Sequence, residues 1–299
     1  MVQKQNKRYP LHQCLLFGTK SKTKLADHLQ VTRNALESAL EVQKYNTFEK
    51  DGRAIQQPIG TLAHIHSRFK KLLSSVETPA YLHSGIKRRS AITNALVHKE
   101  GKYALTLDIK SFYQSADREY VFRFLHHGLN MQTNATEALT QLLTYESFIP
   151  TGSAASQILA FWAYKDFFDE IHALTLNFGM VFSLYVDDIS ISSQNPLPRN
   201  FHIAVNKILQ KANLRLKLRK TKYYGPSDFK SYTGCIVTPR QEIEVPNIQK
   251  QKFIFAVREL AKHPNDSTLN QSALGSLNHM QQIQKPIFQS FRPILETAR

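Results

Sequence analysis

The sequence has few cysteines, few acidic residues relative to basic ones, and no long hydrophobic run. Only two of its 299 residues are cysteines, Cys14 and Cys235, so neither a disulfide framework nor a zinc cluster is expected, and both should be buried, reduced thiols. The longest apolar run, residues 158–164, is too short to cross a bilayer. The polar amino-terminal residues lack a signal-peptide core. These absences predict a cytoplasmic protein without a membrane partner.

The charge balance points to a polyanionic partner. Lys and Arg total 39 against 23 Asp and Glu, which gives a formal net charge of +16 at neutral pH. Nucleic acid is the first candidate for such a partner. The basic residues are dispersed rather than gathered beside an apolar anchor, and this disfavours an acidic membrane surface. A hydrophobic share of 42% is ordinary for a globular chain that is long enough for two or three subdomains.

Two adjacent acidic residues interrupt an alternating apolar pattern. On either side of Asp187 and Asp188, apolar and other side chains alternate over residues 182–186 and 189–193. This pattern predicts two antiparallel strands joined by a tight turn. An isolated pair of this kind is most often a solvated hairpin tip, because Asp is a common turn residue.

A third carboxylate changes this interpretation. Asp108 ends the predominantly apolar, strand-like residues 103–109, and a lone acid there is costly to bury unless it is paired or binds a metal. Three carboxylates at two strand ends can hold two Mg²⁺ ions, which activate an attacking hydroxyl and neutralise a triphosphate. Neighbours on a strand point to opposite faces, so we expect Asp108 and Asp187 to be the principal ligands and Asp188 to be secondary or structural.

These segments resemble the motifs of reverse transcriptases. YVDD at residues 185–188 is similar to their YxDD signature, and LDIKSFY at residues 107–113 resembles their first catalytic-aspartate motif. NALVH at residues 94–98 matches the NAxxH pattern of retron reverse transcriptases, a bacterial family. The resemblance runs from about residue 45 to about residue 234. It implies an α+β fold shaped as polymerase-like fingers, palm and thumb, with an antiparallel palm sheet and flanking helices.

The resemblance also predicts the order of the domains. Three segments are expected, an N-terminal helical segment at residues 1–45, the fingers and palm at residues 46–245, and a small helical thumb at residues 246–299. In the first segment, Ser21 or Thr23 is a predicted cap of one helix and Thr32 of a second. Two short helices with a tight connection also fit a helix-turn-helix, so a DNA-binding regulator is an alternative.

A site for the incoming nucleotide is implied as well. Asp51 and Gly52 predict the turn of a hairpin over residues 45–58. Its basic residues would grip a triphosphate, Arg53 more strongly than Lys50 because a guanidinium offers several donors. Tyr113 lies where reverse transcriptases place an aromatic gate that excludes a ribonucleotide 2′-hydroxyl, although Phe112 and Tyr113 are equally plausible core aromatics by pattern. Lys220 resembles a retron lysine that approaches the leaving group.

A small-residue turn precedes the predicted helix at residues 158–171. Gly152 permits close backbone approach, and a helix N-terminus favours a phosphate or a template strand, although an ordinary loop–helix junction has the same pattern. The turn occupies the position of the family's LPQGxxxSP motif, with Thr151 in place of Gln and Gln157 in place of Pro. We therefore expect only Gly152, Ser153 and Gln157 to line the nucleotide pocket.

RNA-binding residues are implied by the retron-like motifs. Asn94 and His98 lie four residues apart and share a helical face, in a region that retron enzymes use to handle their structured RNA. Tyr232, Thr233 and Gly234 resemble the retron VTG motif near the primer grip, with Tyr in place of Val. In addition, leucine alternates with basic residues over 214–220, which predicts a strand with one basic face.

The function that the resemblance implies is RNA-directed DNA polymerisation, a nucleotidyltransferase reaction that uses dNTPs and two Mg²⁺ ions. The primer would be the 2′-hydroxyl of a guanosine in a cognate noncoding RNA (msr-msd), and the product an RNA-linked single-stranded DNA (msDNA). Retron systems act in anti-phage defence with an effector, which implies a toxin-like protein partner. Two alternatives stay open: a bacterial reverse transcriptase without branched priming, and an RNA-binding scaffold or antitoxin that restrains an effector.

Overall fold

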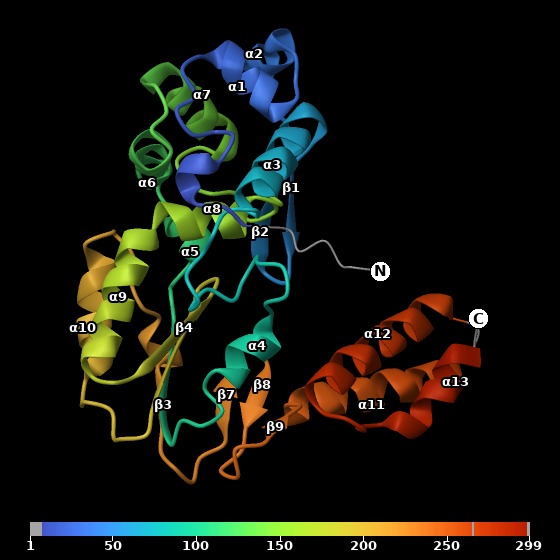
Figure 1. Cartoon of the computed structure of the whole chain (residues 1–299). Coiled ribbons are helices and arrows are strands. Elements are labelled where there is room, and N and C mark those ends of the chain that lie inside the picture. Colours follow the sequence, from blue (N-terminus) through green and yellow to red (C-terminus); the bar gives the residue numbers. More distant parts are fainter. Residues whose placement is uncertain (1–7, 265, 298–299) are drawn as a thin grey trace, which may run out of the picture.

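The computed structural model describes residues 8–264 and 266–297. It has the predicted α+β class, with three antiparallel sheets flanked by helices (Figure 1). The shorter elements are η1 (Leu11–Gln13), α4 (Ala91–Leu96), α5 (Phe112–Ser115), α6 (Arg118–Arg123), η2 (Phe124–Gly128), η3 (Leu218–Lys220) and η4 (Gln289–Phe291). None of the helices in the described part of the chain has the length and apolarity needed to cross a membrane.

The N-terminal helices are packed into the main body of the protein. Helices α1 (Lys22–Leu29) and α2 (Arg33–Glu41) begin at the predicted caps, since the Ser21 and Thr32 side chains accept hydrogen bonds from Lys24 and Ala35 backbone N–H groups. Both helices bury their apolar faces in the main hydrophobic core. They pack against α3 (Gly60–Leu73) and α7 (Thr133–Leu143), at the top of Figure 1. Residues 1–7 of the predicted helical segment lie outside the described residues.

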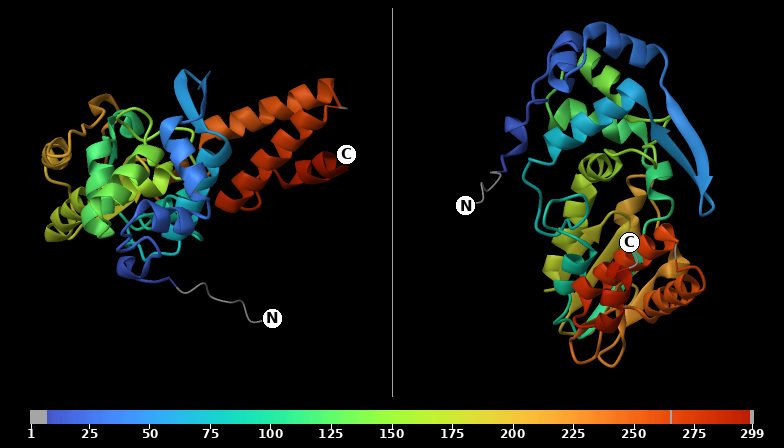
Figure 2. Two further views of the ribbon diagram at one scale, coloured as in Figure 1. Left: turned by 90° about the horizontal axis from the view of Figure 1, so that it is seen from above. Right: turned by 90° about the vertical axis from the view of Figure 1, so that its right-hand side faces the viewer.

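A two-stranded hairpin extends from the fingers, as predicted. Strands β1 (Tyr45–Lys50) and β2 (Arg53–Pro58) pair in antiparallel register around Asp51 and Gly52, whose φ angles are 52° and 70°. Positive φ at both central residues is the requirement of the tight turn that Asp-Gly favours. Figure 2 shows this hairpin projecting from the body of the molecule.

The palm is a four-stranded antiparallel sheet in the order β4-β5-β3-β6. Its strands are β3 (Tyr103–Asp108), β4 (Val181–Tyr185), β5 (Asp188–Ser193) and β6 (Lys222–Tyr224). Leu105, Leu107, Ile189 and Ile191 put one face into the main core. Alternate residues of the same strands, which are mostly polar, form the opposite face. The predicted hairpin around the acidic pair and the predicted strand before Asp108 are both confirmed.

Two predictions of regular structure are wrong. Residues 214–220 form one isolated bridge, between Leu216 and Ile109, and then the turn η3, because β6 occupies the edge of β3. Leu214 and Leu216 are buried, as the alternation predicts, but Leu218 is 62% exposed. The single helix expected at 158–171 is two helices, α8 (Ser156–Ala163) and α9 (Lys165–Asn177), which meet at Tyr164. Helix α10 (Phe201–Gln210) packs beside α9.

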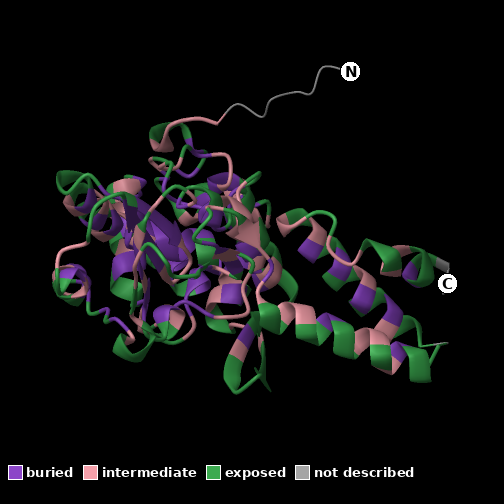
Figure 3. Ribbon diagram, turned by 90° about the horizontal axis from the view of Figure 1, so that it is seen from below, coloured by how far each residue is buried: buried purple, intermediate pink, exposed green. Residues whose placement is uncertain are grey.

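The C-terminal part encloses a hydrophobic core of its own. A small sheet of β7 (Lys230–Tyr232), β8 (Cys235–Val237) and β9 (Ile243–Glu244) leads into three helices. These helices are α11 (Asn247–Lys262), α12 (Ser267–Ile283) and α13 (Arg292–Thr297). The core residues Phe253, Leu260 and Leu277 lie between them, and Figure 3 shows buried residues along their facing sides. Asp266 caps the start of helix α12, because its carboxylate accepts hydrogen bonds from two backbone N–H groups.

Candidate active site

Three carboxylates that are distant in the sequence converge at one end of the palm sheet. Asp108 ends β3, and Asp188 begins β5 directly opposite it in the register. The Asp187 carbonyl accepts a hydrogen bond of 2.9 Å from Ile109 N, so the third acid is tied to the same strand end. Sheet pairing therefore places side by side the acids that the sequence separates by about eighty residues.

The turn that carries two of these acids is strained. Val186 has φ +59°, a left-handed conformation that is unfavourable for a β-branched residue, by about 1–3 kcal/mol. Its N–H donates a hydrogen bond of 3.0 Å to Ser84 Oγ, and His83 N donates one of 2.9 Å to Leu184 O. The segment around Ser84 thus holds β4 and the turn in place. Sequence reasoning missed Ser84, because no local pattern links it to a turn a hundred residues away.

The electrostatics of the site favour a cation. Burial raises the pKa of Asp187, and the neighbouring Asp108 charge raises it further. Burial, followed by the charges of Asp187 and Asp108, raises the pKa of Asp188 to about 6. The Lys220 ammonium forms an ion pair with the Asp108 carboxylate, and the charges of Lys220 and Arg53 only partly offset the rise in the pKa of Asp187.

The donor set fits Mg²⁺. Carboxylate oxygens are the hard ligands that Mg²⁺ binds, and a divalent ion relieves the repulsion that raises these pKa values. Asp108, Asp187 and Asp188 would hold the ions. Within the described ranges, no group of three His, Cys, Asp or Glu side chains is arranged so that it could hold a metal ion as it stands. The Asp108 carboxylate forms an ion pair with Lys220 in this structure.

Removing one of the crowded acids should stabilise the metal-free protein. The pKa of Asp188 is about 6 in the folded chain and has an ordinary value of 3.8. The folded chain therefore binds this proton more tightly than the unfolded chain, and the free energy of unfolding falls as pH rises from 3.8 to about 6. We expect Asp188→Asn to raise the free energy of unfolding by about 1–3 kcal/mol at pH 7 and to leave it nearly unchanged at pH 4. Urea unfolding in EDTA at both pH values measures this, and a variant less stable than the parent at pH 7 contradicts it.

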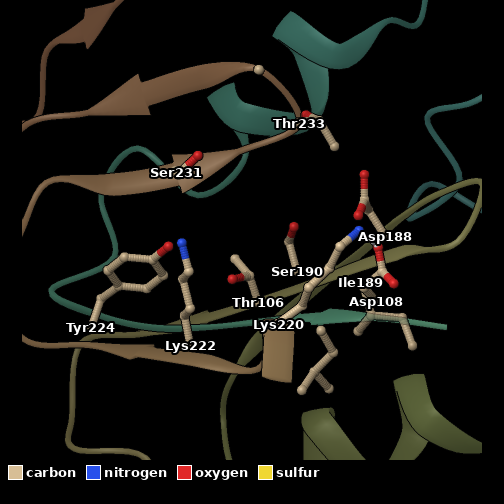
Figure 4. A pocket seen from close by; sticks show the side chains of 12 residues that line it. Thr106, Asp108, Asp188, Ile189, Ser190, Lys220, Lys222, Tyr224, Ser231 and Thr233 are labelled. Atoms are coloured by element: carbon tan, nitrogen blue, oxygen red, sulfur yellow. Dashed lines mark hydrogen bonds and ion pairs between the residues drawn. The ribbon is translucent and has the colours of Figure 1, made fainter. Parts of the chain in front are cut away.

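Two clefts meet at these carboxylates. The fingers-side cleft, of about 320 Å³, is lined by residues that include Arg53, Tyr113 and Asp187. The thumb-side cleft, of about 330 Å³, lies over the polar face of the palm sheet and reaches Asp188 (Figure 4). Asp108 and Lys220 line both clefts. A group bound in one cleft therefore faces a group bound in the other across the acidic cluster.

The structure brings part of the predicted nucleotide site together. Arg53, Tyr113 and Lys220 all line the fingers-side cleft. Lys50 is exposed and pairs with Arg53 across the hairpin turn, but it is not among the residues that line the cleft. Phe112 is almost fully buried and packs against Tyr164 and Phe168, whereas Tyr113 is only partly buried.

The predicted loop residues Gly152, Ser153 and Gln157 do not line this cleft. A Cβ on Gly152 would lie 2.7 Å from Gln56 O, so this glycine lets the loop pack against β2. Ser153 Oγ hydrogen-bonds with a histidine ring nitrogen at 2.5 Å, and Gln157 is exposed. Thr151, which replaces the Gln of the family motif and was not expected to line the pocket, does line the cleft. Its hydroxyl donates a 2.9 Å hydrogen bond to Ala54 O.

The motif residues Asn94 and His98 are fully buried, at 0% exposure each. The His98 ring hydrogen-bonds through Nδ1 with Ser192 Oγ at 2.8 Å and through Nε2 with Ser183 Oγ at 2.6 Å. It also stacks on Tyr232, with 4.9 Å between ring centroids. The prediction that both residues bind RNA directly is therefore corrected: their side chains have no surface to offer, and they support the palm from within.

The β7–β8 turn rests on this buried unit. Asn94 Nδ2 donates a 3.3 Å hydrogen bond to Thr233 Oγ1, which itself donates one of 3.0 Å to Ala91 O. Tyr232 is buried, while Thr233 and Gly234 line the thumb-side cleft. Of the five predicted RNA-binding residues, these two face a cleft.

Loss of the buried histidine should be costly for the fold. We expect His98→Ala to lower the free energy of unfolding by about 2–4 kcal/mol, because it leaves a cavity and two hydroxyls without partners. Burial, followed by the charge of His83, lowers the pKa of His98 to about 3, so the stability it contributes is present above pH 6.5 and declines as pH falls. Chemical denaturation measures both effects. The control is His279→Ala, because His279 is exposed. Equal free energies of unfolding for the two variants contradict the structural role of His98.

These features define a polymerase-type palm with fingers and thumb. The palm sheet carries a strained acidic turn, an adjoining cleft contains an aromatic residue and an arginine, and the C-terminal part is separate and helical. The chain belongs to the reverse transcriptase family. Residues 44–237, more than half of the chain, match the family described as reverse transcriptase (RNA-dependent DNA polymerase). This match confirms the resemblance drawn from the sequence motifs.

Similar curated proteins are retron reverse transcriptases. The Retron Se72 reverse transcriptase of Salmonella heidelberg (strain 579083-10) is 27% identical over 161 residues, which cover 54% of this chain and 42% of that protein. The Retron Ec86 reverse transcriptase of Escherichia coli is 24% identical over 195 residues, which cover 64% of this chain and 60% of that protein. The chain thus matches about half the length of these relatives.

Solved structures of telomerases are also similar. The apo telomerase from Candida tropicalis, truncated from its C-terminal domain, has a TM-score of 0.45 and 12% identity, covering 68% of this chain and 55% of that chain. The telomerase from Candida albicans in complex with a TWJ fragment of telomeric RNA has a TM-score of 0.46 and 12% identity, covering 87% of this chain and 60% of that chain.

Proposed function

We propose that this protein is a retron-type RNA-directed DNA polymerase that reverse transcribes a structured noncoding RNA. The observation that supports this most strongly is the convergence of Asp108, Asp187 and Asp188 where two clefts meet. Family membership and the retron relatives support the choice of an RNA template. The net charge of +16 suits a nucleic-acid partner.

In this proposal the fingers-side cleft holds the dNTP. The Arg53 guanidinium contacts phosphate oxygens, and the Tyr113 ring lies under the sugar. A primer hydroxyl oxygen in the thumb-side cleft attacks the α-phosphorus, so that one P–O bond forms, the bond to the β-phosphate oxygen breaks and pyrophosphate leaves, while the hydroxyl proton passes to solvent. Two bound Mg²⁺ ions would supply Lewis-acid activation of the hydroxyl and charge neutralisation at the phosphates. Lys220 must release Asp108 for that carboxylate to bind an ion.

The finer proposal concerns priming and context. The first primer is the 2′-hydroxyl of a guanosine in the cognate RNA, and the product is RNA-linked single-stranded DNA, msDNA. The protein acts in the cytoplasm, in anti-phage defence beside an effector protein. The NALVH motif at residues 94–98 and the similarity to retron reverse transcriptases support the retron type, and these statements are what that type implies.

Sequencing the nucleic acid that co-purifies with the chain tests the proposal. We expect a single RNA species joined to DNA, in which RNase treatment leaves a DNA strand and debranching enzyme releases the RNA from it. DNA without a branch would favour a reverse transcriptase that primes from an ordinary 3′ end. RNA without any DNA, unchanged in the Asp187→Asn variant, would favour the RNA-binding scaffold and contradict the polymerase.

A further inference from the structure

A short segment before α4, residues 79–84, lies along the outer edge of the palm sheet. Leu82 forms an isolated parallel bridge with Leu184 of β4. Two residues further along this segment, Ser84 Oγ accepts the 3.0 Å hydrogen bond from Val186 N. The acidic turn, residues 185–188, is therefore attached to a segment that lies about a hundred residues earlier in the chain.

The acidic turn depends on this attachment because its own sequence does not favour its shape. Val186 and Asp187 form a two-residue loop between the paired residues Tyr185 and Asp188. The φ angle is positive at Val186 but not at Asp187. A loop of this kind normally has glycine at its first position, because a β-branched residue is strained there. The hydrogen bond to Ser84 thus stabilises a backbone conformation that sets the direction of two carboxylates.

Arg89 in turn fixes the segment that carries Ser84. Its Nη1 donates hydrogen bonds of 2.6 Å to both Pro79 O and Leu82 O. Pro79 begins the segment, and Leu82 is the residue that pairs with β4. One guanidinium therefore holds the start of the segment and the point at which it joins the palm sheet.

Arg89 differs from the two basic residues that precede it. Lys87 and Arg88 are exposed, whereas Arg89 is partly buried. Burial, followed by the charge of Arg8, lowers the pKa of Arg89, and no carboxylate contributes to this shift. Both side-chain hydrogen bonds of Arg89 go to backbone carbonyls. Its donors are thus used to hold the segment.

Neither Arg89 nor Ser84 lines the fingers-side cleft or the thumb-side cleft. A nucleotide or primer bound in these clefts therefore has no direct contact with either side chain. Any influence of the two residues on the reaction has to pass through the backbone of the acidic turn.

We propose that Arg89 and Ser84 are positioning residues for the metal-binding carboxylates, Arg89 by fixing residues 79–84 and Ser84 by holding the acidic turn. This inference rests on the proposed polymerase function. Part of the affinity for the divalent ions then depends on residues that touch neither an ion nor a substrate.

Metal affinity measured without turnover tests the inference. Mn²⁺ is titrated into the chain with a saturating primed RNA template and an unreactive dNTP analogue, and the free ion is followed by electron paramagnetic resonance. We expect Arg89→Met and Ser84→Ala each to weaken Mn²⁺ binding by about fivefold, the effect of about one lost hydrogen bond. The double variant should lose about five- to tenfold rather than about 25-fold, because both residues act on one turn.

Primer extension supplies a second readout. In both single variants, the Mg²⁺ concentration for half-maximal rate should rise by about fivefold, as the Mn²⁺ affinity falls. The KM for dNTP at saturating Mg²⁺ should stay within about twofold of the parent, because neither side chain lines the nucleotide cleft. Arg89→Lys keeps a charged donor and should recover part of the Mn²⁺ affinity that Arg89→Met loses.

Two matched controls separate positioning from charge and from general stability. Arg88→Met removes the same charge at the neighbouring exposed position. Thr19→Val removes a buried hydroxyl that donates a 2.8 Å hydrogen bond to Leu16 O and lines neither cleft. Both controls should keep the Mn²⁺ affinity of the parent, although Thr19→Val should lower the free energy of unfolding as Ser84→Ala does.

Parent-like Mn²⁺ affinity in both Arg89→Met and Ser84→Ala overturns the inference, and so does an equal loss of affinity in Thr19→Val. If Arg89→Met does not fold, Ser84→Ala decides alone. Failure of the unsubstituted chain to bind Mn²⁺ or to extend the primer contradicts the polymerase proposal itself.

Discussion

Replacing Asp108 by Asn should reduce dNTP incorporation by at least about a thousandfold, because a metal-binding carboxylate supplies several kcal/mol of transition-state stabilisation. Asp108 is the acid that lines both clefts and pairs with Asp188 across the sheet. Asparagine has the same size but cannot neutralise a divalent ion. The rate is measured by extension of a primer on an RNA template with saturating dNTP.

The loss must be chemical rather than structural. The Asp108→Asn variant should unfold at about the same denaturant concentration as the parent, because the relief of repulsion among the three acids offsets the loss of the ion pair with Lys220. Asp27→Asn, at an exposed position of α1, is the matched control and should retain full activity. An Asp108→Asn variant with rates within tenfold of the parent rules out the metal-binding assignment.

Replacing Tyr113 by Val should admit ribonucleotides. The Tyr113 ring lines the fingers-side cleft with Asp187 and tilts against Phe112, with 5.8 Å between ring centroids. Burial raises the pKa of its phenol, so the hydroxyl stays protonated at neutral pH. We expect the ratio of kcat/KM for rNTP to that for dNTP to rise by about 10- to 200-fold, the range in which enzymes discriminate substrates that differ by one small group.

The conservative variant sharpens this test. Tyr113→Phe keeps the ring and should keep the sugar selectivity, whereas Tyr113→Val removes the ring and should lose it. Single-nucleotide incorporation of matched rNTP and dNTP pairs measures the ratio for both variants. If Tyr113→Val selects dNTPs as strongly as the parent, the gate lies elsewhere in the cleft.

The sequence predicted those hairpins, turns and helix caps that depend on residues close together in the chain. The alternation around Asp187 and Asp188 predicted a hairpin, and the Asp51–Gly52 pair predicted a turn with positive φ. The caps Ser21 and Thr32 follow from side chains that satisfy free N–H groups at helix starts. Each of these features depends on residues within a few positions of one another.

What the sequence could not predict depends on tertiary pairing. The strand expected at 214–220 does not form, because β6 competes for the edge of β3. The helical spacing of Asn94 and His98 does not reveal which element covers that face, and the structure buries both against β7 and the palm. The support of the Val186 turn by Ser84 likewise arises only from the folded arrangement.

Direct measurement of metal binding tests the central claim. Mn²⁺ is titrated into the chain with a primed RNA template and a dNTP analogue that cannot react, and the free ion is followed by electron paramagnetic resonance. The account predicts two bound Mn²⁺ ions per chain, displaced by Mg²⁺, and their loss in the Asp108→Asn and Asp187→Asn double variant. Binding of the same number of ions with the same affinity in that double variant would contradict it.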